Sequence, residues 1–223
     1  MSEPALEFRD VGFSYRASRE TIPVLAHASH RFASGTFYTV LGPSGVGKTT
    51  ALMLAGALDM PQSGQVLYGG QDVRRLGATA VRRQRVAFVF QSLNLIPYLN
   101  GVQNVMAAMA IHQMPRPVQR TRAPAALEQL GLTREEGRRN VNRLSGGQQQ
   151  RVAIARALAC DVDVILADEP TGNLDEETGG EIVALFRRLA HEQGTCVIAV
   201  THSRYVANQS DQVLHLEGGQ FVG

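Results

Sequence analysis

Several features that mark whole classes of protein are scarce or missing in this 223-residue chain. Its two cysteines, Cys160 and Cys196, lie in separate apolar stretches, so we expect buried, reduced thiols rather than a zinc site or a disulfide framework. The longest unbroken apolar run, Val105 to Ile111, has seven residues, far fewer than the roughly 18 of a membrane span. The first twenty residues contain acids at positions 3, 7 and 10 and no apolar segment typical of a secretory signal. We therefore expect a cytoplasmic chain that does not cross a bilayer.

Neither sign of charge dominates the composition. The 22 basic and 20 acidic residues give a net charge of +2, which is too small to imply a nucleic-acid partner, and none is expected. With 44% hydrophobic and 19% charged residues, the chain can form a sizeable core, and disorder is excluded. Lysine is almost absent, because 21 of the basic residues are arginine and Lys48 is the one lysine. This ammonium group is therefore a candidate functional group.

Apolar runs spread along the chain predict an α/β fold. They are continuous rather than alternating, which is typical of parallel strands buried on both faces. The predicted strands are Phe37–Leu41, Val86–Phe90, Val162–Ala167 and Cys196–Val200. The apolar stretch Ala51–Leu58 predicts a helix, which the segment from Met60 to Gly64 would end.

The other segments complete a single domain, residues 1–223, with two parts. Alternating hydrophobicity in the first 35 residues, with turns near Gly12 and Gly35, and again from Gly64 to Tyr68, predicts an antiparallel β edge. Residues 94–144 contain prolines and many Ala, Gln and Arg residues, and they predict a helical subdomain. The core would then comprise residues 1–93 and 145–223.

The segment from Gly42 to Thr49 matches the phosphate-loop pattern G-x-x-x-x-G-K-[ST] between a predicted strand and a predicted helix. Backbone N–H groups of such a loop surround phosphates, Lys48 would meet the β and γ oxygens, and Thr49 can bind Mg²⁺. A compact ammonium fits inside this loop where a planar guanidinium does not. An ordinary glycine-rich turn is the alternative, and the flanking strand and helix argue against it. The predicted nucleotide-binding residues here are Gly42, Pro43, Ser44, Gly45, Val46, Gly47, Lys48, Thr49 and Thr50.

Two adjacent acids, Asp168 and Glu169, end the apolar strand that begins at Val162. Neighbouring side chains at a strand end point in different directions, so the two carboxylates can take different roles. Asp168 would hold Mg²⁺, and Glu169 would polarise or deprotonate the attacking water. An isolated acidic strand end is more often a turn or a helix cap, but the phosphate loop in the same chain favours the catalytic interpretation.

The segment from Leu144 to Arg151 precedes a predicted helix. Ser145 is a candidate N-cap, and Gly146 and Gly147 allow another backbone or a ligand to approach closely. From the residues alone, this segment is either a capped helix start or a second set of free N–H groups for an anion.

The order of these motifs resembles the nucleotide-binding subunit of an ABC (ATP-binding cassette) transporter. The phosphate loop, Leu-Ser-Gly-Gly-Gln at 144–148 and the hydrophobic-Asp-Glu-Pro segment that ends at Pro170 follow one another as in that family. The resemblance extends over nearly the whole chain. It implies a phosphate-loop ATPase core with a mostly parallel sheet, an antiparallel β edge and a helical subdomain, with ATP and Mg²⁺ as cofactors.

The resemblance also implies further site residues. Tyr15 matches the aromatic that stacks on adenine, although a tyrosine in this pattern is equally a strand core residue. Gln91 matches a glutamine that contacts the metal and the attacking water. Asp175, in Gly-Asn-Leu-Asp at 172–175, matches the D-loop. His202 matches the switch histidine, whereas a single histidine there would more often be a structural hydrogen-bonding residue.

The family further implies an assembly. Two chains would dimerise head to tail around two ATP molecules, each lending Ser145, Gly146, Gly147 and Gln148 to the γ-phosphate of the other chain's ATP. The segment 170–175 is similar to that of lipoprotein-release and macrolide-export ATPases. Since no membrane span is predicted, a separate transmembrane permease is the expected partner, and the chain would lie peripherally on the inner face of the cell membrane. The expected docking surface lies near residues 91–105, although some of its apolar residues would form the subdomain's own core.

Two alternative functions remain. A soluble ABC-type ATPase not coupled to transport would share these motifs, but the coiled coils, zinc modules or second cassette typical of such proteins do not fit in 223 residues. A switch that binds ATP without hydrolysis is the second alternative, and the presence of Glu169 and His202 argues against it.

Overall fold

The computed structural model describes residues 4–17, 20–172 and 174–223, and its main sheet contains the four predicted apolar strands together with two strands that were not predicted, Gln212–Glu217 and Gln220–Val222. Within these ranges the sheet has the order β10-β9-β3-β8-β7-β6. Strands β9, β3, β8, β7 and β6 run parallel to one another, and β10 is antiparallel to β9. The strands are β3 (Phe37–Leu41), β6 (Val86–Val89), β7 (Val164–Asp168), β8 (Cys196–Val200), β9 (Gln212–Glu217) and β10 (Gln220–Val222).

A second, antiparallel sheet has the order β2-β1-β4-β5 and confirms the predicted β edge. Its strands are β1 (Leu6–Ala17), β2 (Glu20–Phe32), β4 (Ser63–Tyr68) and β5 (Gln71–Asp72). The predicted turn at Gly12 is wrong, because Gly12 lies inside β1 at a shift in register. A Cβ at Gly12 would lie 2.4 Å from the hydroxyl oxygen of Ser63 on β4, so a larger residue would force that side chain to move. The turn at Gly35 is confirmed, with a φ of +71°.

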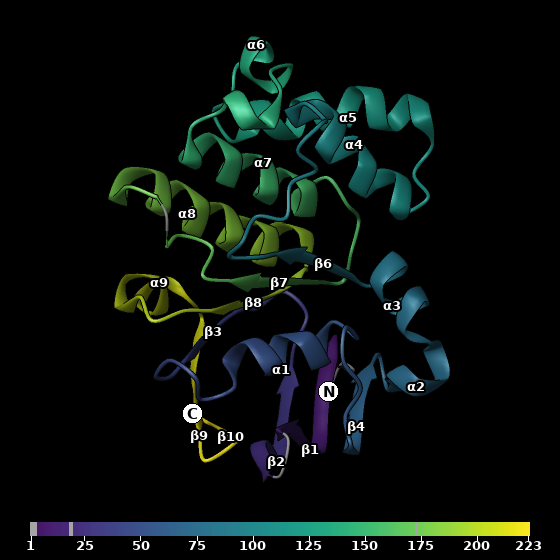
Figure 1. Ribbon diagram of the computed structural model, residues 1–223, viewed down its shortest axis with the longest axis vertical. Helices are drawn as coiled ribbons and strands as arrows, with labels where there is room; N and C mark the ends of the chain where they lie inside the picture. Colours follow the sequence, from purple (N-terminus) through teal and green to yellow (C-terminus); the bar gives the residue numbers. More distant parts are fainter. Residues whose placement is uncertain (1–3, 18–19, 173) are drawn as a thin grey trace.

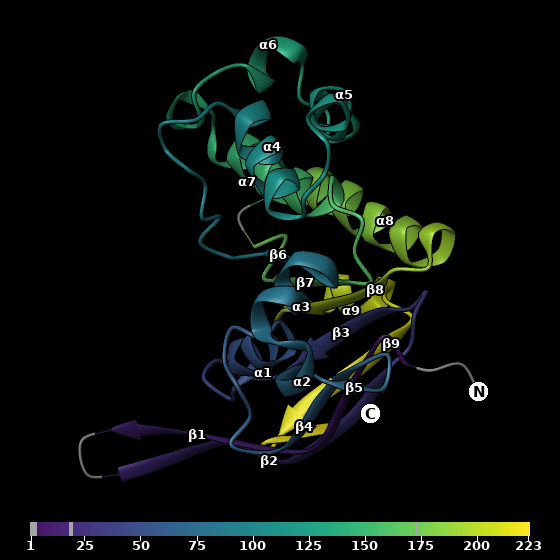
Figure 2. The same ribbon diagram turned by 90° about the vertical axis from the view of Figure 1, so that its right-hand side faces the viewer.

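Helices cover both faces of the main sheet (Figure 1). Helix α1 lies on one face, and α7 and α8 lie on the other, with α4, α5 and α6 beyond them. Figure 2 shows the β1–β2 hairpin extending away from the body of the molecule. The helices are α1 (Lys48–Ala55), α2 (Val73–Leu76), α3 (Ala78–Gln84), α4 (Gly101–Ile111), α5 (Arg116–Gln129), α6 (Arg134–Gly137), α7 (Gly146–Leu158), α8 (Glu176–Gln193) and α9 (Arg204–Gln209), with a 3₁₀ turn at Val141–Arg143.

Helix α1 differs in its bounds from the predicted helix over Ala51–Leu58. It begins earlier because Gly47, with a φ of +108°, turns the loop directly into the helix. It ends at Ala55 because Ala57, with a φ of +53°, leaves the helical conformation, and the amide of Leu58 then donates to the carbonyl of Met53 over 2.9 Å. Gly56 leaves room for the ring of Phe88, which a Cβ would overlap.

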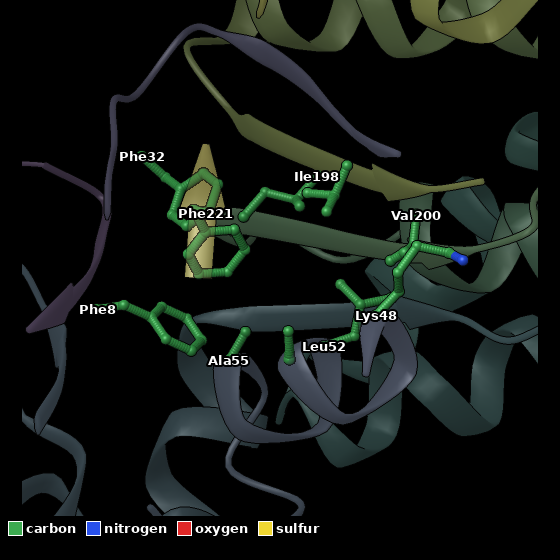
Figure 3. Close-up of a pocket in the computed structure, with 10 residues that line it drawn as sticks. Phe8, Phe32, Lys48, Leu52, Ala55, Ile198, Val200 and Phe221 are labelled. Carbon is green, nitrogen blue, oxygen red and sulfur yellow. The ribbon is translucent and has the colours of Figure 1, made fainter. Parts of the chain in front are cut away.

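The two faces of the sheet belong to two separate cores, because successive strand residues point to opposite sides. Val197 and Ala199 of β8 face α7 and α8, whereas Ile198 and Val200 face α1. Figure 3 shows part of the second core, where Phe8, Phe32 and Phe221 approach Ile198, Val200 and the aliphatic part of Lys48. The phosphate-loop helix therefore rests on a rigid apolar base.

Both cysteines are buried and free, as predicted. Burial raises the pKa of each thiol to about 12, so both stay protonated at neutral pH. No helix in the described ranges combines the length and apolarity that a membrane crossing requires.

Candidate active site

The parallel strands bring the predicted site residues to one edge of the main sheet. The phosphate loop follows β3, His202 lies just beyond β8, Asp168 ends β7, and Gln91 lies just beyond β6. Because the strand order is β3-β8-β7-β6, the segments lie side by side in that order at the carboxyl ends of the strands. Open α/β sheets bind ligands at this edge.

The phosphate loop adopts a shape that favours glycine. Gly45 and Gly47 have φ values of +81° and +108°, and a Cβ at Gly47 would also press on Val24. The ammonium of Lys48 donates to the carbonyls of Gly42 and Pro43 over 2.7 and 2.9 Å. The charge of Lys48 thus lies inside the loop, beside the N-terminus of α1.

A hydroxyl and a carboxylate meet beside this loop. Thr49 Oγ1 donates to Oδ2 of Asp168 over 3.0 Å, across 119 residues of sequence. Burial raises the pKa of Asp168 and the neighbouring Glu169 adds to that effect, whereas the hydrogen bond from Thr49 and the charge of Lys48 lower it. The hydroxyl oxygen of Thr49 and the carboxylate of Asp168 are oxygen ligands of the kind that hard metal ions prefer.

Glu169 points away from Asp168, as expected for neighbours at a strand end. Its Oε2 accepts a hydrogen bond from the hydroxyl of Thr201 over 2.8 Å, and its Oε1 lies 2.8 Å from Nδ1 of His202. Its φ of +46° is left-handed, which is strained for a residue with a Cβ. The backbone is held there by the Glu169 amide, which donates to the carbonyl of Val200 over 2.9 Å.

Tyr15 lies beside the phosphate-loop helix. Its hydroxyl is 3.3 Å from Oγ1 of Thr50, and its ring packs edge to face on Phe13 with centroids 5.1 Å apart. Its exposed fraction is 43%, so Tyr15 is not a core residue.

The segment Ser145–Gln148 begins α7, in the helical layer opposite α1 (Figure 1). Ser145 and Gln148 form a reciprocal capping box, in which the Gln148 amide donates to the Ser145 hydroxyl and the Ser145 amide to Gln148 Oε1. Ser145 and Gly146 are exposed, and a Cβ built at Gly146 meets no atom within 4 Å. The surface at this helix start is therefore open to a second molecule.

Asp175 is the N-cap of α8. Its carboxylate accepts from the amide and the hydroxyl of Thr178 over 2.8 and 2.9 Å, and these bonds lower the pKa of Asp175. Of the predicted D-loop, Asn173 lies outside the described residues.

A family model described as ABC transporter matches residues 25–172, about two thirds of the chain and most of the edge just described. The chain belongs to the ABC transporter family. As an ABC cassette it is an ATP-binding subunit, and ATP hydrolysis is its reaction.

Relatives of the cassette agree over its full length. The ABC transporter ATP-binding protein YclH of Bacillus subtilis is 46% identical over 217 residues, which are 97% of this chain and 95% of that protein. The lipoprotein-releasing system ATP-binding protein LolD of Hyphomonas neptunium is 35% identical over 225 residues, covering 100% and 98% of the two chains. The macrolide export ATP-binding/permease protein MacB 2 of Aeromonas hydrophila is 40% identical over 223 residues, covering 99% of this chain and 34% of that protein. The predicted resemblance to the lipoprotein-release and macrolide-export subgroup is confirmed.

Solved structures agree with the fold of the cassette. A dimeric structure of a bacterial ABC transporter cassette matches with a TM-score of 0.91 at 37% identity, covering 98% of this chain and 97% of that one. A post-hydrolysis state of the same cassette with ADP and Pi gives 0.91 at 36% identity, with the same coverage. The predicted fold class is therefore confirmed.

Sequence reasoning missed two polar residues of the cassette's site. Thr201 directly precedes His202, and nothing in the sequence separates it from the end of an apolar strand. Arg156 contacts the segment after Gln91 from a helix 62 residues further along the chain. The signal for Arg156 is weak, since it is one of 21 arginines.

Proposed function

We propose that the cassette works as a head-to-tail dimer around two Mg-ATP molecules and drives a separate membrane subunit. The observation that carries the proposal is the common edge of β3, β8, β7 and β6, where Lys48, Asp168, Glu169 and His202 lie together. The dimeric state of a solved cassette of the same fold supports the dimer.

Thr49 and Asp168 would hold Mg²⁺. A hydroxyl and a carboxylate oxygen 3.0 Å apart fit the hard-oxygen preference of this ion, and phosphate oxygens of ATP would complete its shell. Gln91 would add an amide oxygen from beyond β6. The ion neutralises charge on the phosphates. Lys48 would exchange its carbonyl partners for the β and γ oxygens, with the amides of 42–50 around them.

Glu169 would orient and deprotonate the attacking water, as a catalytic residue. Its carboxylate is already fixed by Thr201 and His202, so its orientation needs little adjustment when ATP binds. His202 is largely exposed, which leaves its other ring nitrogen free to reach the γ-phosphate. Proton removal by Glu169 and charge stabilisation by Lys48 and His202 would together promote cleavage.

The second chain would complete each site. The exposed start of α7, Ser145 to Gly147 with Gln148 behind it, offers N–H groups and the positive end of a helix dipole. We place this surface against the γ-phosphate on the partner. Tyr15 would stack its ring on adenine, and Asp175, which begins α8, would line the dimer interface as the family's D-loop does.

A membrane permease would dock on the helical subdomain, residues 94–144, which we distinguish from the core of residues 1–93 and 145–223. Within the predicted docking segment, Leu95 packs into the core, whereas Tyr98 is 79% exposed. Tyr98 is therefore the stronger candidate for the contact. The names of two relatives, a macrolide export ATP-binding/permease protein and a lipoprotein-releasing system ATP-binding protein, support a transport role with a permease partner.

The decisive experiment uses Glu169→Gln, which keeps the size of the side chain and removes its basicity. We expect turnover to fall by roughly 10²- to 10⁴-fold while Mg-ATP still binds. Uncleaved ATP should then hold two chains together, so size-exclusion chromatography with Mg-ATP should give a dimer for this variant and mainly a monomer for the wild type.

A matched control and a second substitution sharpen this test. Glu192→Gln changes an exposed glutamate at the end of α8 and should behave as the wild type. Adding Ser145→Arg to Glu169→Gln should abolish the dimer. The larger side chain would occupy the surface at the start of α7, which the γ-phosphate bound to the other chain must approach. An ATP-bound Glu169→Gln chain that stays monomeric, with and without membrane partner, would contradict the shared site.

A further inference from the structure

Arg156, on the last turns of α7, reaches the segment that follows Gln91. Its Nη2 donates to the carbonyl of Leu93 and its Nη1 to the carbonyl of Asn94, each over 2.5 Å. The planar guanidinium therefore binds two consecutive carbonyls through two nitrogens of one rigid fork, whereas a lysine would have to reach both carbonyls with its single nitrogen.

The backbone that Arg156 binds has an unfavourable conformation. Leu93 and Asn94 have φ values of +59° and +47°, in the left-handed region that residues with a Cβ rarely occupy. Local bonds contribute, since the amide of Leu93 donates to the carbonyl of Phe90 over 3.1 Å and the amide of Asn94 to that of Ser92 over 2.6 Å. Two left-handed residues in succession turn their carbonyls toward one side, and the guanidinium lies there. The turn that begins at Gln91 thus depends on a group from another element.

The surroundings of Arg156 differ from those of a surface arginine. Burial lowers the pKa of its guanidinium, and within the described part of the chain no carboxylate pairs with it. Arg122, on α5, instead forms a bidentate ion pair with Asp161 over 2.8 and 2.5 Å. A buried cation is costly unless its hydrogen bonds are well satisfied, and here two carbonyl dipoles satisfy it. The hydrogen bonds of Arg156 therefore depend on the positions of the Leu93 and Asn94 carbonyls in this turn.

Helix α7 also contacts the segment after β7. Gln150 Nε2 donates to the carbonyl of Pro170 over 2.9 Å, and Arg151 donates to Oγ1 of Thr178, the residue that binds Asp175. The same helix begins with the exposed Ser145. A rigid helix thus connects the surface offered to the second chain with the turn after Gln91.

We propose that Arg156 is a positioning residue, which fixes the turn at 91–94 so that Gln91 is presented beside Asp168 at the edge of the sheet. The proposal rests on the role given to Gln91 above. Arg156 contacts neither nucleotide nor metal in this arrangement and acts only through the turn.

The test compares Arg156→Lys, which keeps the charge but loses the fork, with Arg156→Met, which loses both. Arg122→Lys is the matched control, because it makes the same change at an arginine that binds a carboxylate. Three quantities are measured on the full chain: kcat and KM for Mg-ATP, amide hydrogen exchange of residues 91–96 without nucleotide, and Tm.

For Arg156→Lys we expect kcat to fall about 10- to 100-fold with KM for ATP within twofold of the wild type, since displacement of about 1 Å at a reacting centre costs this much. Amide hydrogen exchange of residues 91–96 should accelerate at least tenfold, whereas exchange in α7 should stay unchanged. Arg156→Met should show the same pattern more strongly, and Arg122→Lys neither effect. Wild-type exchange in this segment for Arg156→Lys would overturn the proposal. A fall in Tm or in folded yield with exchange raised throughout α4 and α7 would also overturn it, because the role would then be structural.

Gln91→Ala separates this proposal from the one on which it rests. If Gln91→Ala leaves kcat unchanged, the role of Gln91 in hydrolysis is wrong, while exchange of residues 91–96 still decides whether Arg156 holds the turn. If Gln91→Ala lowers kcat and Arg156→Lys leaves kcat unchanged, the positioning role of Arg156 is wrong.

Discussion

The hydroxyl of Thr201 donates to Oε2 of Glu169 over 2.8 Å, and this bond joins the ends of β8 and β7. Thr201 is fully buried, and its hydroxyl also accepts from the amide of Ser203 over 3.0 Å. With His202 on the other carboxylate oxygen, two consecutive residues of one segment fix both oxygens of Glu169. The orientation of the Glu169 carboxylate is therefore set by the segment that directly follows β8.

Thr201→Val should lower kcat without weakening ATP binding. Valine has nearly the shape of threonine but cannot donate to Glu169, so the carboxylate gains rotational freedom. We expect kcat to fall about tenfold with KM nearly unchanged, and a loss of about 1 kcal/mol in unfolding free energy from the hydrogen bonds removed. Phosphate release and thermal unfolding measure the two effects.

Thr39→Val is the control for this change. Thr39 is equally buried, on β3, and among the described residues its hydroxyl has no hydrogen-bond partner. Its replacement should leave kcat unchanged and the fold equally or more stable, because an unpaired buried hydroxyl is removed. Thr201→Ser should recover most of the lost kcat. Wild-type kcat in Thr201→Val would show that this hydroxyl does not position the base.

Lys48→Arg should remove most ATP binding and turnover while the fold stays intact. The ammonium now fits between the carbonyls of Gly42 and Pro43, and a larger planar group would have to enter the same loop. We expect the Kd for ATP to rise at least about tenfold, which costs about 1.4 kcal/mol of binding free energy. Titration calorimetry measures this value, and wild-type affinity would contradict the assignment of the phosphate loop.

Tyr98→Glu should abolish binding to the membrane subunit. Because Tyr98 is 79% exposed, the substitution adds a charge at the surface without disturbing a core, and ATP affinity should stay close to that of the wild type. Copurification from solubilised membranes measures the loss. Leu95→Glu serves as a contrast, because Leu95 packs into the core and its charge should unfold the subdomain. Unchanged copurification of Tyr98→Glu would place the docking surface elsewhere or indicate an ATPase uncoupled from transport.

Asp211→Asn should reduce stability in a pH-dependent way. The carboxylate accepts from the amide of Phe37 over 2.8 Å and lies 2.9 Å from Nε2 of His191. Although burial favours the neutral acid, these donors hold the pKa of Asp211 below its ordinary value. A lowered folded-state pKa stabilises the fold above the unfolded pKa of about 3.9, and this contribution is lost as the pH falls through the folded pKa.

We therefore expect Asp211→Asn to lower Tm at pH 7 by roughly 2 to 4 °C and to flatten the further loss of Tm between about pH 4 and pH 2. Melting curves across this range test it, with Glu192→Gln as a surface control. An acid profile identical to that of the wild type would contradict the assigned pKa shift.

The sequence by itself determined the fold class and most of the edge. The runs at Phe37–Leu41 and Cys196–Val200 have the bounds predicted for them, because strands buried on both faces form nearly continuous apolar runs. The phosphate loop could be predicted equally well. Its glycines are favoured by the conformation of the backbone, and its lysine is favoured by the limited space inside the loop. Residues that follow parallel strands lie at one edge of the sheet, so the sequence predicts that Asp168, Glu169 and His202 lie close together.

Only the tertiary structure decided which of these groups bind one another. Thr201 and Arg156 bind groups on elements far apart from them in the sequence, and neither differs in type or spacing from ordinary neighbours. The prediction of a turn at Gly12 was wrong because the contact that favours a small residue there comes from another strand, β4, and cannot be seen in the segment around Gly12. A local pattern specifies backbone conformation and burial, whereas a hydrogen bond between side chains depends on how two elements are packed. The orientation of the Glu169 carboxylate is a property of that packing.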